Sequence, residues 1–205
     1  PLSFASQNPI LSTMNRQTPK KISSLKNHFL VAMPNLDDPT FAKSVVYICE
    51  HNADGAMGLI INQQMDVSVK AIFDQLKLDY DAEFARPLLF DGGPVQRDRG
   101  FILHPHCERQ WESTVDISDE VSLTASRDIL TDIALGNGPK QSLIMLGYAQ
   151  WDGGQLEQEL AENSWLTMPA DADIIFNTEC AQQATAAALS IGLDLRMLSH
   201  EAGHA

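Results

Sequence analysis

Cysteine is scarce in this sequence, and long apolar runs are missing from it. The three cysteines, Cys49, Cys107 and Cys180, are far apart and odd in number, and no CxxC pair occurs, which argues against a disulfide framework and a thiolate zinc site. No apolar stretch approaches the roughly 20 residues that span a bilayer, and the first dozen residues do not resemble a secretory signal. We therefore expect a cytoplasmic protein without a membrane partner.

Basic residues are also few, and their distribution is uneven. The chain has 14 Lys and Arg against 27 Asp and Glu, a formal net charge of −13. Four of the basic residues precede every acidic one, so that residues 28–205 carry 10 basic and 27 acidic side chains. Such a charge balance repels a phosphate backbone. Direct nucleic-acid binding by this acidic part is not expected, which leaves a protein or a small molecule as the predicted partner.

The order of apolar segments and turns predicts a single α+β domain at residues 28–205, preceded by a flexible basic extension at residues 1–27. Two β-rich segments, 44–50 and 56–62, are separated by a short loop that ends in glycine, which is typical of an antiparallel hairpin. The apolar segment 142–148 is predicted to be a central strand. The other predicted strands are 28–33, 87–90, 101–104, 115–117, 121–123 and 172–176, and the predicted helices are 67–78, 127–135, 155–162 and 181–193. Strands joined by both turns and helices indicate a sheet of mixed direction.

The glycine-rich segment 91–100 is a candidate ligand site. Glycines such as Gly92 and Gly93 let backbone amides approach a ligand, and Arg99 can clamp a carboxylate or phosphate. Neither GxxxxGK[ST] nor GxGxxG occurs, so no nucleotide or other cofactor is assigned, and a structural hairpin loop remains the alternative. Combined with the hairpin loop, the start of the 127–135 helix and the turn before 155, this segment gives a predicted recognition surface of ten residues: Glu50, His51, Asn52, Asp91, Gly92, Gly93, Arg99, Arg127, Asp128 and Trp151.

An enzymatic alternative is a metal-assisted hydrolase of unknown substrate. Residues 200–204 read HEAGH and so match the HExxH zinc-protease pattern, but a glycine inside the motif and its place at the chain end argue against a firmly held helix. The segment 104–107 holds two histidines and a cysteine around Pro105. Cys49 lies two residues before His51, and if both side chains face the same side of a strand, the histidine could activate the thiolate. No set of catalytic or metal-binding residues is complete, so we favour a non-enzymatic role and assign no metal.

Several segments resemble the bacterial AlgH-like (YqgE) family. They include HFLVAMP at 28–34, SVVYICEHN at 44–52, GAMGLIIN at 55–62, GGPV at 92–95 and LGYA at 146–149, and the likeness extends over almost all of 28–205. This resemblance implies an α+β fold with a bifurcated, partly barrel-like sheet surrounded by helices. It also implies a regulatory role, because the family carries the description of transcriptional regulator. We therefore expect a bacterial regulatory or ligand-binding protein that acts on transcription indirectly.

Overall fold

A sheet that divides along one central strand organises the fold. The computed structural model describes residues 24–195. The strands are β1 (His28–Ala32), β2 (Val45–Asn52), β3 (Gly55–Ile60), β4 (Gln64–Ser68), β5 (Leu88–Asp91), β6 (Val95–Pro105), β7 (Thr114–Asp116), β8 (Val121–Thr124), β9 (Leu143–Asp152) and β10 (Trp165–Pro169). The helices are α2 (Lys70–Leu76), α3 (Arg127–Ala134), α4 (Gln155–Ala161), α5 (Ala172–Asn177) and α6 (Cys180–Ser190).

The strand order is β10-β1-β2-β3-β9-β6-β8-β7, and β4 and β5 leave this path beside β9. All pairings are antiparallel except that of β5 with β9. In the first half of β9, Met145 pairs with both β5 and β6, whereas in the second half Ala149 pairs with β3. The sheet therefore forks within β9, and the curled α+β architecture expected from the sequence is confirmed.

Glycine makes the fork sterically feasible. Gly147 has a φ of +75°, and a Cβ there would lie 2.3 Å from the carbonyl oxygen of Gly93. Gly93 itself has a φ of +145°, and its Cβ would lie 2.3 Å from the carbonyl carbon of Tyr148. Only residues without a side chain allow the β5–β6 connection to cross β9 this closely.

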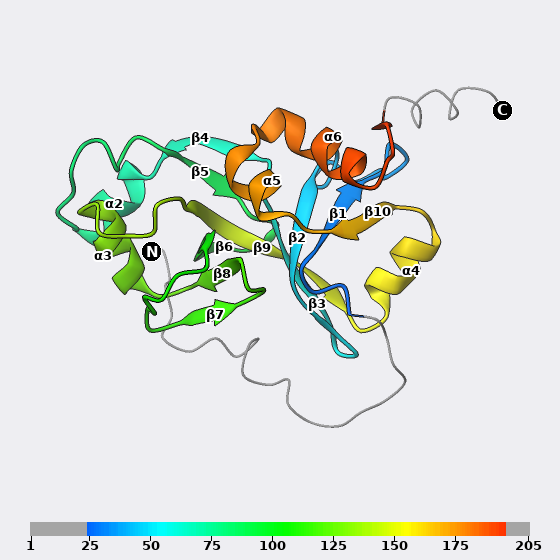
Figure 1. Ribbon diagram of the computed structural model, residues 1–205, viewed down its shortest axis with the longest axis horizontal. Coiled ribbons are helices and arrows are strands. Elements are labelled where there is room, and N and C mark those ends of the chain that lie inside the picture. Colours follow the sequence, from blue (N-terminus) through cyan, green and yellow to red (C-terminus); the bar gives the residue numbers. More distant parts are fainter. Residues whose placement is uncertain (1–23, 196–205) are drawn as a thin grey trace.

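The helices cover different parts of the sheet (Figure 1). Helices α2 and α3 lie at one end of the molecule and α4 at the other, with α5 and α6 over one side of the sheet (Figure 1). Each helix buries an apolar face: Ile129, Leu130 and Ile133 of α3 enter one core cluster, and Leu156 of α4 enters another. A third and larger cluster lies between the sheet and the α5–α6 pair.

Some predicted elements need correction. Residues 172–176, predicted as a strand, belong to helix α5, whose first turn is capped by Asp171 through a 2.8 Å bond from the Asp173 amide. Strands β4 and β10 were not predicted. The spacing of Val67 predicts a helical position, but Val67 lies in β4. Helix α2 begins only at Lys70.

The predicted boundary at residue 28 stays a prediction, but the described end of the extension contacts the domain. The Asn27 amide donates to the carbonyl oxygen of Ile48 at 2.9 Å, and Ser24 Oγ donates to that of His51 at 2.9 Å. The HExxH match at 200–204 lies outside the described residues. Within residues 24–195, no helix has both the length and the apolarity needed to cross a membrane.

Candidate functional site

A small pocket lies at the β2–β3 hairpin, where that hairpin meets the end of β9. Register places Glu50 opposite Met57, and Met57 opposite Gln150. The pocket has a volume of about 60 Å³, and it is lined by Glu50, Asp54, Gly55, Ala56, Met57, Gln150 and Trp151. Two of the predicted recognition residues, Glu50 and Trp151, are thus brought together in what we call the Glu50 pocket.

The carboxyl group of Glu50 is incompletely satisfied. Its Oε2 atom is buried without a hydrogen-bond partner. Burial raises the pKa of Glu50, and the nearby Lys26 ammonium lowers it by a smaller amount. A half-buried carboxylate of this kind is stabilised by a cation or by hydrogen-bond donors that enter the pocket.

Trp151 also lines the pocket, and its side chain is held by contacts within the fold. The residue is 3% exposed, and its ring packs edge to face with that of Trp165 at a centroid distance of 6.0 Å. Both indole nitrogens donate to the same atom, Oε2 of Glu159 in α4, at 2.8 Å. The one hydrogen-bond donor of the Trp151 indole is therefore used within the fold.

His51 and Cys49 do not form an activated pair. The alternation of β2 is interrupted by a bulge between Ile48 and Glu50, so that Cys49 packs in the main core while His51 contacts α4. His51 Nδ1 accepts from the Leu25 amide at 2.9 Å, which leaves Nε2 to donate to Glu157 at 3.0 Å. Burial raises the pKa of the Cys49 thiol. The expectation of a shared face for these two residues is wrong, and the thiol is not activated.

The glycine-rich segment connects β5 to β6 at the fork of the sheet. The Gly92 amide donates to the carbonyl oxygen of Leu146 at 2.8 Å, and the Gly93 amide to Asp91 Oδ1 at 3.3 Å. Asp91 also forms an ion pair with Arg97. Both glycine amides therefore have partners within the protein, which favours the structural alternative for this loop. Arg99 lies on β6 and has a different environment, described below.

Arg127 and Asp128 lie apart from the Glu50 pocket, since α3 and α4 occupy opposite ends of the molecule (Figure 1). Arg127 donates to the carbonyl oxygen of Leu76 at 2.6 Å. Asp128 accepts from the Glu112 amide at 2.9 Å and from Ser126 Oγ at 2.5 Å. These contacts join the loop before β7 and the end of α2 to α3. The recognition role of the ten residues stays a prediction, but the structure does not gather them on one surface. Asn52 ends β2, where it pairs with Gly55.

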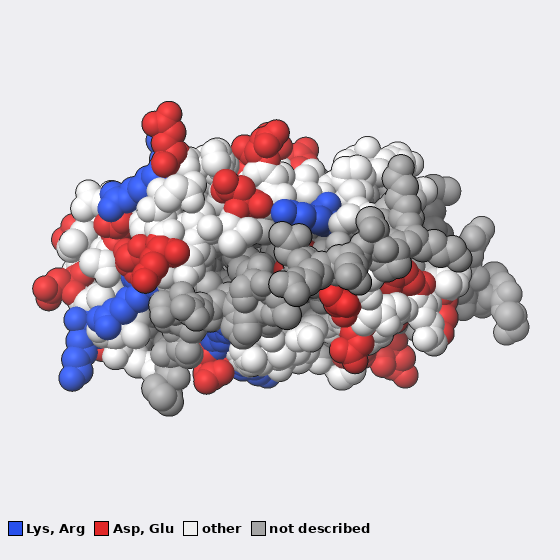
Figure 2. All heavy atoms as spheres, turned by 90° about the horizontal axis from the view of Figure 1, so that it is seen from below, with Lys and Arg blue, Asp and Glu red and all other residues white. Residues whose placement is uncertain are grey.

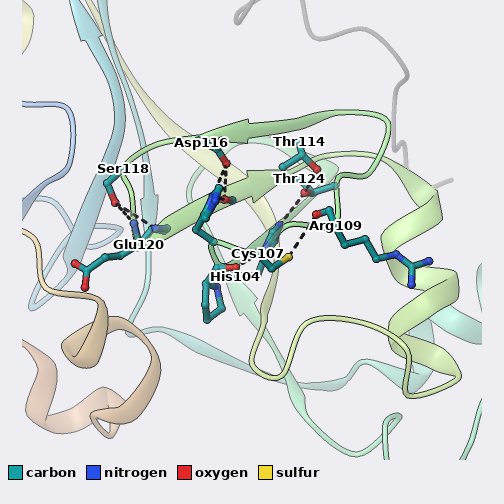
Figure 3. A network of polar contacts seen from close by, with 12 residues as sticks. His104, Cys107, Arg109, Thr114, Asp116, Ser118, Glu120 and Thr124 are labelled. Carbon is teal, nitrogen blue, oxygen red and sulfur yellow. Dashed lines mark hydrogen bonds and ion pairs between the residues drawn. The ribbon is translucent and has the colours of Figure 1, made fainter.

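A network of polar contacts lies on β6, β7 and β8 (Figure 3). His104 is buried, with Nδ1 2.9 Å from the carbonyl oxygen of Pro105 and Nε2 2.9 Å from Thr124 Oγ1. The carbonyl oxygen can only accept, so Nδ1 carries the proton and Nε2 accepts from Thr124. Burial lowers the pKa of His104.

A serine, a histidine and an aspartate also meet in this network, without the arrangement of a hydrolase. Ser122 Oγ donates to Asp116 Oδ1 at 2.7 Å, and His106 Nδ1 lies 3.1 Å from the same oxygen and 3.4 Å from Ser122 Oγ. A proton relay needs the serine and the aspartate on different nitrogens of the imidazole. Here both lie at Nδ1, and the serine proton already goes to the carboxylate.

The segment 104–107 does not form a metal site in the structure. His104 and His106 have the partners given above, and the Cys107 thiol donates to the carbonyl oxygen of Arg109 at 3.4 Å. Among residues 24–195, no group of three or more His, Cys, Asp or Glu side chains is arranged to hold a metal ion.

Sequence reasoning missed Asp54, Met57 and Gln150 as pocket residues. The hairpin loop 51–55 was recognisable, but the side chains that surround Glu50 depend on the pairing of β3 with β9. Three larger grooves, of about 460, 490 and 560 Å³, lie around residues 136–143 and beside α5 and α6. None of them is lined by a charged side chain with an unpaired buried atom, within the described part of the chain.

Charge is distributed unevenly over one face of the molecule. On the face shown in Figure 2, basic side chains gather mainly toward the end that holds α2 and α3, whereas acidic side chains predominate toward α4. Trp151, which lines the Glu50 pocket, donates to Glu159 of α4.

The forked sheet and the helices at both of its ends define a single α+β domain. A solved structure with the same architecture is that of the AlgH protein from Pseudomonas aeruginosa, which is 44% identical, with a TM-score of 0.75 over 92% of this chain and 100% of that one. A Corynebacterium diphtheriae protein at 18% identity shares the fold, with a TM-score of 0.66 over 93% of this chain and 96% of that one.

The chain belongs to the AlgH-like family, whose model matches residues 29–196. Relatives described as UPF0301 proteins occur in Thioalkalivibrio sulfidiphilus, at 50% identity over 89% of this chain and 98% of the relative, and in Saccharophagus degradans, at 50% over 89% of each. The family resemblance inferred from the sequence is thereby confirmed.

Proposed function

We propose that this protein is a non-enzymatic regulatory protein that binds a basic side chain of a partner protein in the Glu50 pocket. The observation that carries the proposal is the half-buried Glu50 carboxyl group with an unpaired oxygen. A buried acceptor of this kind costs free energy until a donor reaches it. A cationic donor offsets that cost best, because it also favours the charged carboxylate.

The size of the pocket supports a side chain over a complete small molecule. Drug-sized ligands occupy pockets of about 300–1,000 Å³, whereas the Glu50 pocket has about 60 Å³. A cavity of about 10–15 Å³ suffices to hold one water molecule, so the Glu50 pocket has room for the end of a lysine or arginine side chain. The rest of the partner would lie on the surface around the hairpin.

The charge of the molecule supports the same partner. Asp54 also lines the pocket, and the whole chain has a net charge of −13. Complementary charge accelerates encounter with a basic surface and disfavours a phosphate backbone. Regulation of transcription would then be indirect, through a protein partner in the cytoplasm. The hydrolase alternative has no supporting arrangement among residues 24–195.

A titration with a lysine analogue tests the proposal. Nα-acetyl-lysine methylamide added to the full chain should shift the backbone amide resonances of Gly55, Ala56 and Met57 in a saturable manner. Glu50→Gln keeps the shape of the side chain but removes its charge, and we expect it to weaken binding about tenfold or more, since tenfold corresponds to about 1.4 kcal/mol.

Two controls give the titration its specificity. Glu108→Gln removes an exposed carboxylate outside the pocket and should leave binding unchanged, and Nα-acetyl-glutamate methylamide should not bind. Equal affinity of the Glu50→Gln variant and the unchanged protein would refute the proposal.

A further inference from the structure

Arg99 is a buried cation whose hydrogen-bonding groups are largely unused. The residue is 7% exposed, and its Nε and Nη2 atoms are buried without a partner. The only side-chain hydrogen bond of Arg99 among the described residues runs from Nη1 to Gln96 Oε1 at 3.3 Å. Buried charges are normally paired, because an isolated ion is strongly destabilised away from water.

No acidic side chain of residues 24–195 forms an ion pair with Arg99. The acidic residue at the start of this loop, Asp91, is engaged by Arg97 and by the Gly93 amide. The positive charge of Arg99 nevertheless acts on Tyr148. Burial raises the pKa of Tyr148, and the charge of Arg99 lowers it by a smaller amount. Residues 24–195 therefore enclose a guanidinium without supplying its counter-ion.

The backbone holds this guanidinium in a defined place. Between the pairs Val95–Tyr148 and Gly100–Leu146, β6 is bulged, so that residues 96–99 lie opposite Gly147 alone. Gln96 in this bulge has a φ of +46°. The guanidinium carbon of Arg99 lies 5.4 Å from the centroid of the Phe101 ring, over its face. Stacking on an aromatic ring orients the plane of a guanidinium and leaves its edges for hydrogen bonding.

We infer that the unpaired Nε–Nη2 edge of Arg99 is the binding site for a carboxylate group of a ligand. The two N–H groups of this edge are parallel and match the two oxygens of a carboxylate in a bidentate pair. Tyr148 lies next to it as part of the same aromatic group, with its ring 5.7 Å from that of Phe101 and its hydroxyl donating to Gln150 at 3.3 Å. A monoanionic carboxylate is favoured over a doubly charged phosphate because the chain already carries a net charge of −13.

Side-chain NMR of the full chain provides the test. Sodium acetate is the probe, and sodium phosphate is titrated separately to compare a carboxylate with a phosphate. Acetate should shift the Arg99 Nε–Hε resonance downfield and saturate, whereas chloride at equal ionic strength should not. This readout uses the unchanged protein, so it does not depend on any variant folding. Saturation by phosphate at a lower concentration than acetate, or no saturable shift with acetate, would overturn the inference.

Variants separate the geometry of the site from its charge. Arg99→Lys keeps the positive charge but loses the two parallel N–H groups of the guanidinium. We expect at least a tenfold loss of acetate affinity, measured by the shift of the Tyr148 amide resonance. Arg97→Lys, an exposed arginine on the same strand, should bind acetate as the unchanged protein does. Undiminished binding by Arg99→Lys would contradict the site. The inference does not rest on the Glu50 pocket, so Glu50→Gln should leave acetate binding intact.

Discussion

Buried or half-buried ionisable side chains of this protein differ in whether their polar atoms have hydrogen-bond partners. Glu50 and Arg99 both have buried polar atoms without partners, whereas both ring nitrogens of the buried His104 and both carboxylate oxygens of Glu159 have hydrogen-bond partners. The engaged groups stabilise the fold. The buried polar atoms without partners lower the stability of the fold, and a ligand that forms hydrogen bonds with them would offset this cost.

His104 should make the stability of the protein sensitive to mild acid. Burial lowers its pKa in the folded state, whereas a histidine in an unfolded chain has a pKa of about 6.5. Below that pH the unfolded chain binds more protons than the folded one, so the free energy of unfolding falls as the pH falls.

We expect His104→Gln, which does not titrate, to lose less stability than the unchanged protein between pH 7 and pH 5, by about 1 kcal/mol. Urea unfolding at the two pH values measures the difference. His28→Gln, at a partly exposed histidine of β1, is the matched control and should follow the unchanged protein. Parallel pH dependence of His104→Gln and the unchanged protein would show that His104 does not contribute in this way.

At the scale of elements, the fork in the sheet depends on glycine. Gly93→Ala would place a Cβ 2.3 Å from the backbone of Tyr148, at a φ of +145°, and we expect it to cost about 3 kcal/mol or more of unfolding free energy. Gly154 also has a positive φ, +82°, but no atom lies within 4 Å of its ideal Cβ. Gly154→Ala should therefore cost only about 1 kcal/mol. Urea unfolding followed by tryptophan fluorescence compares the two, and equal costs would refute the steric basis of the fork.

The sequence indicates the elements whose signals are local. The β2–β3 hairpin and the central strand β9 follow from apolar alternation, a glycine-ended loop and a continuous apolar run, and helices α3 and α4 follow from their spacing. The pattern of helix α5 is ambiguous, because a short apolar run does not distinguish strand from helix, and only the cap at Asp171 favours the helix. Strand β4 is largely exposed and β10 ends in a proline, so neither has a strong pattern.

Side-chain direction was the part of the site that the sequence did not reveal. A single bulge after Ile48 reverses the faces of the following residues, which separates Cys49 from His51 and turns Glu50 toward Met57. The distance between the Glu50 pocket and Arg127 likewise depends on which strands are neighbours, and non-local pairing leaves no local signal.

At the scale of the whole molecule, the two proposed binding groups share one stretch of the sheet. Gln150 lines the Glu50 pocket and accepts a hydrogen bond from the Tyr148 hydroxyl. The charge of Arg99 in turn lowers the pKa of Tyr148 against the larger effect of burial. A partner that offers a basic and an acidic group could therefore contact both Glu50 and Arg99 along β9. The acidic end of the molecule around α4 (Figure 2) would attract the basic group first.

The most direct test of the central claim is the pKa of the Glu50 carboxyl group, measured in the full chain by ¹³C NMR with and without Nα-acetyl-lysine methylamide. In the free protein we expect the pKa to be raised by burial. At saturating ligand it should fall, because the bound ammonium favours the charged carboxylate. A pKa that is unchanged by the ligand would contradict the binding of a basic group at Glu50.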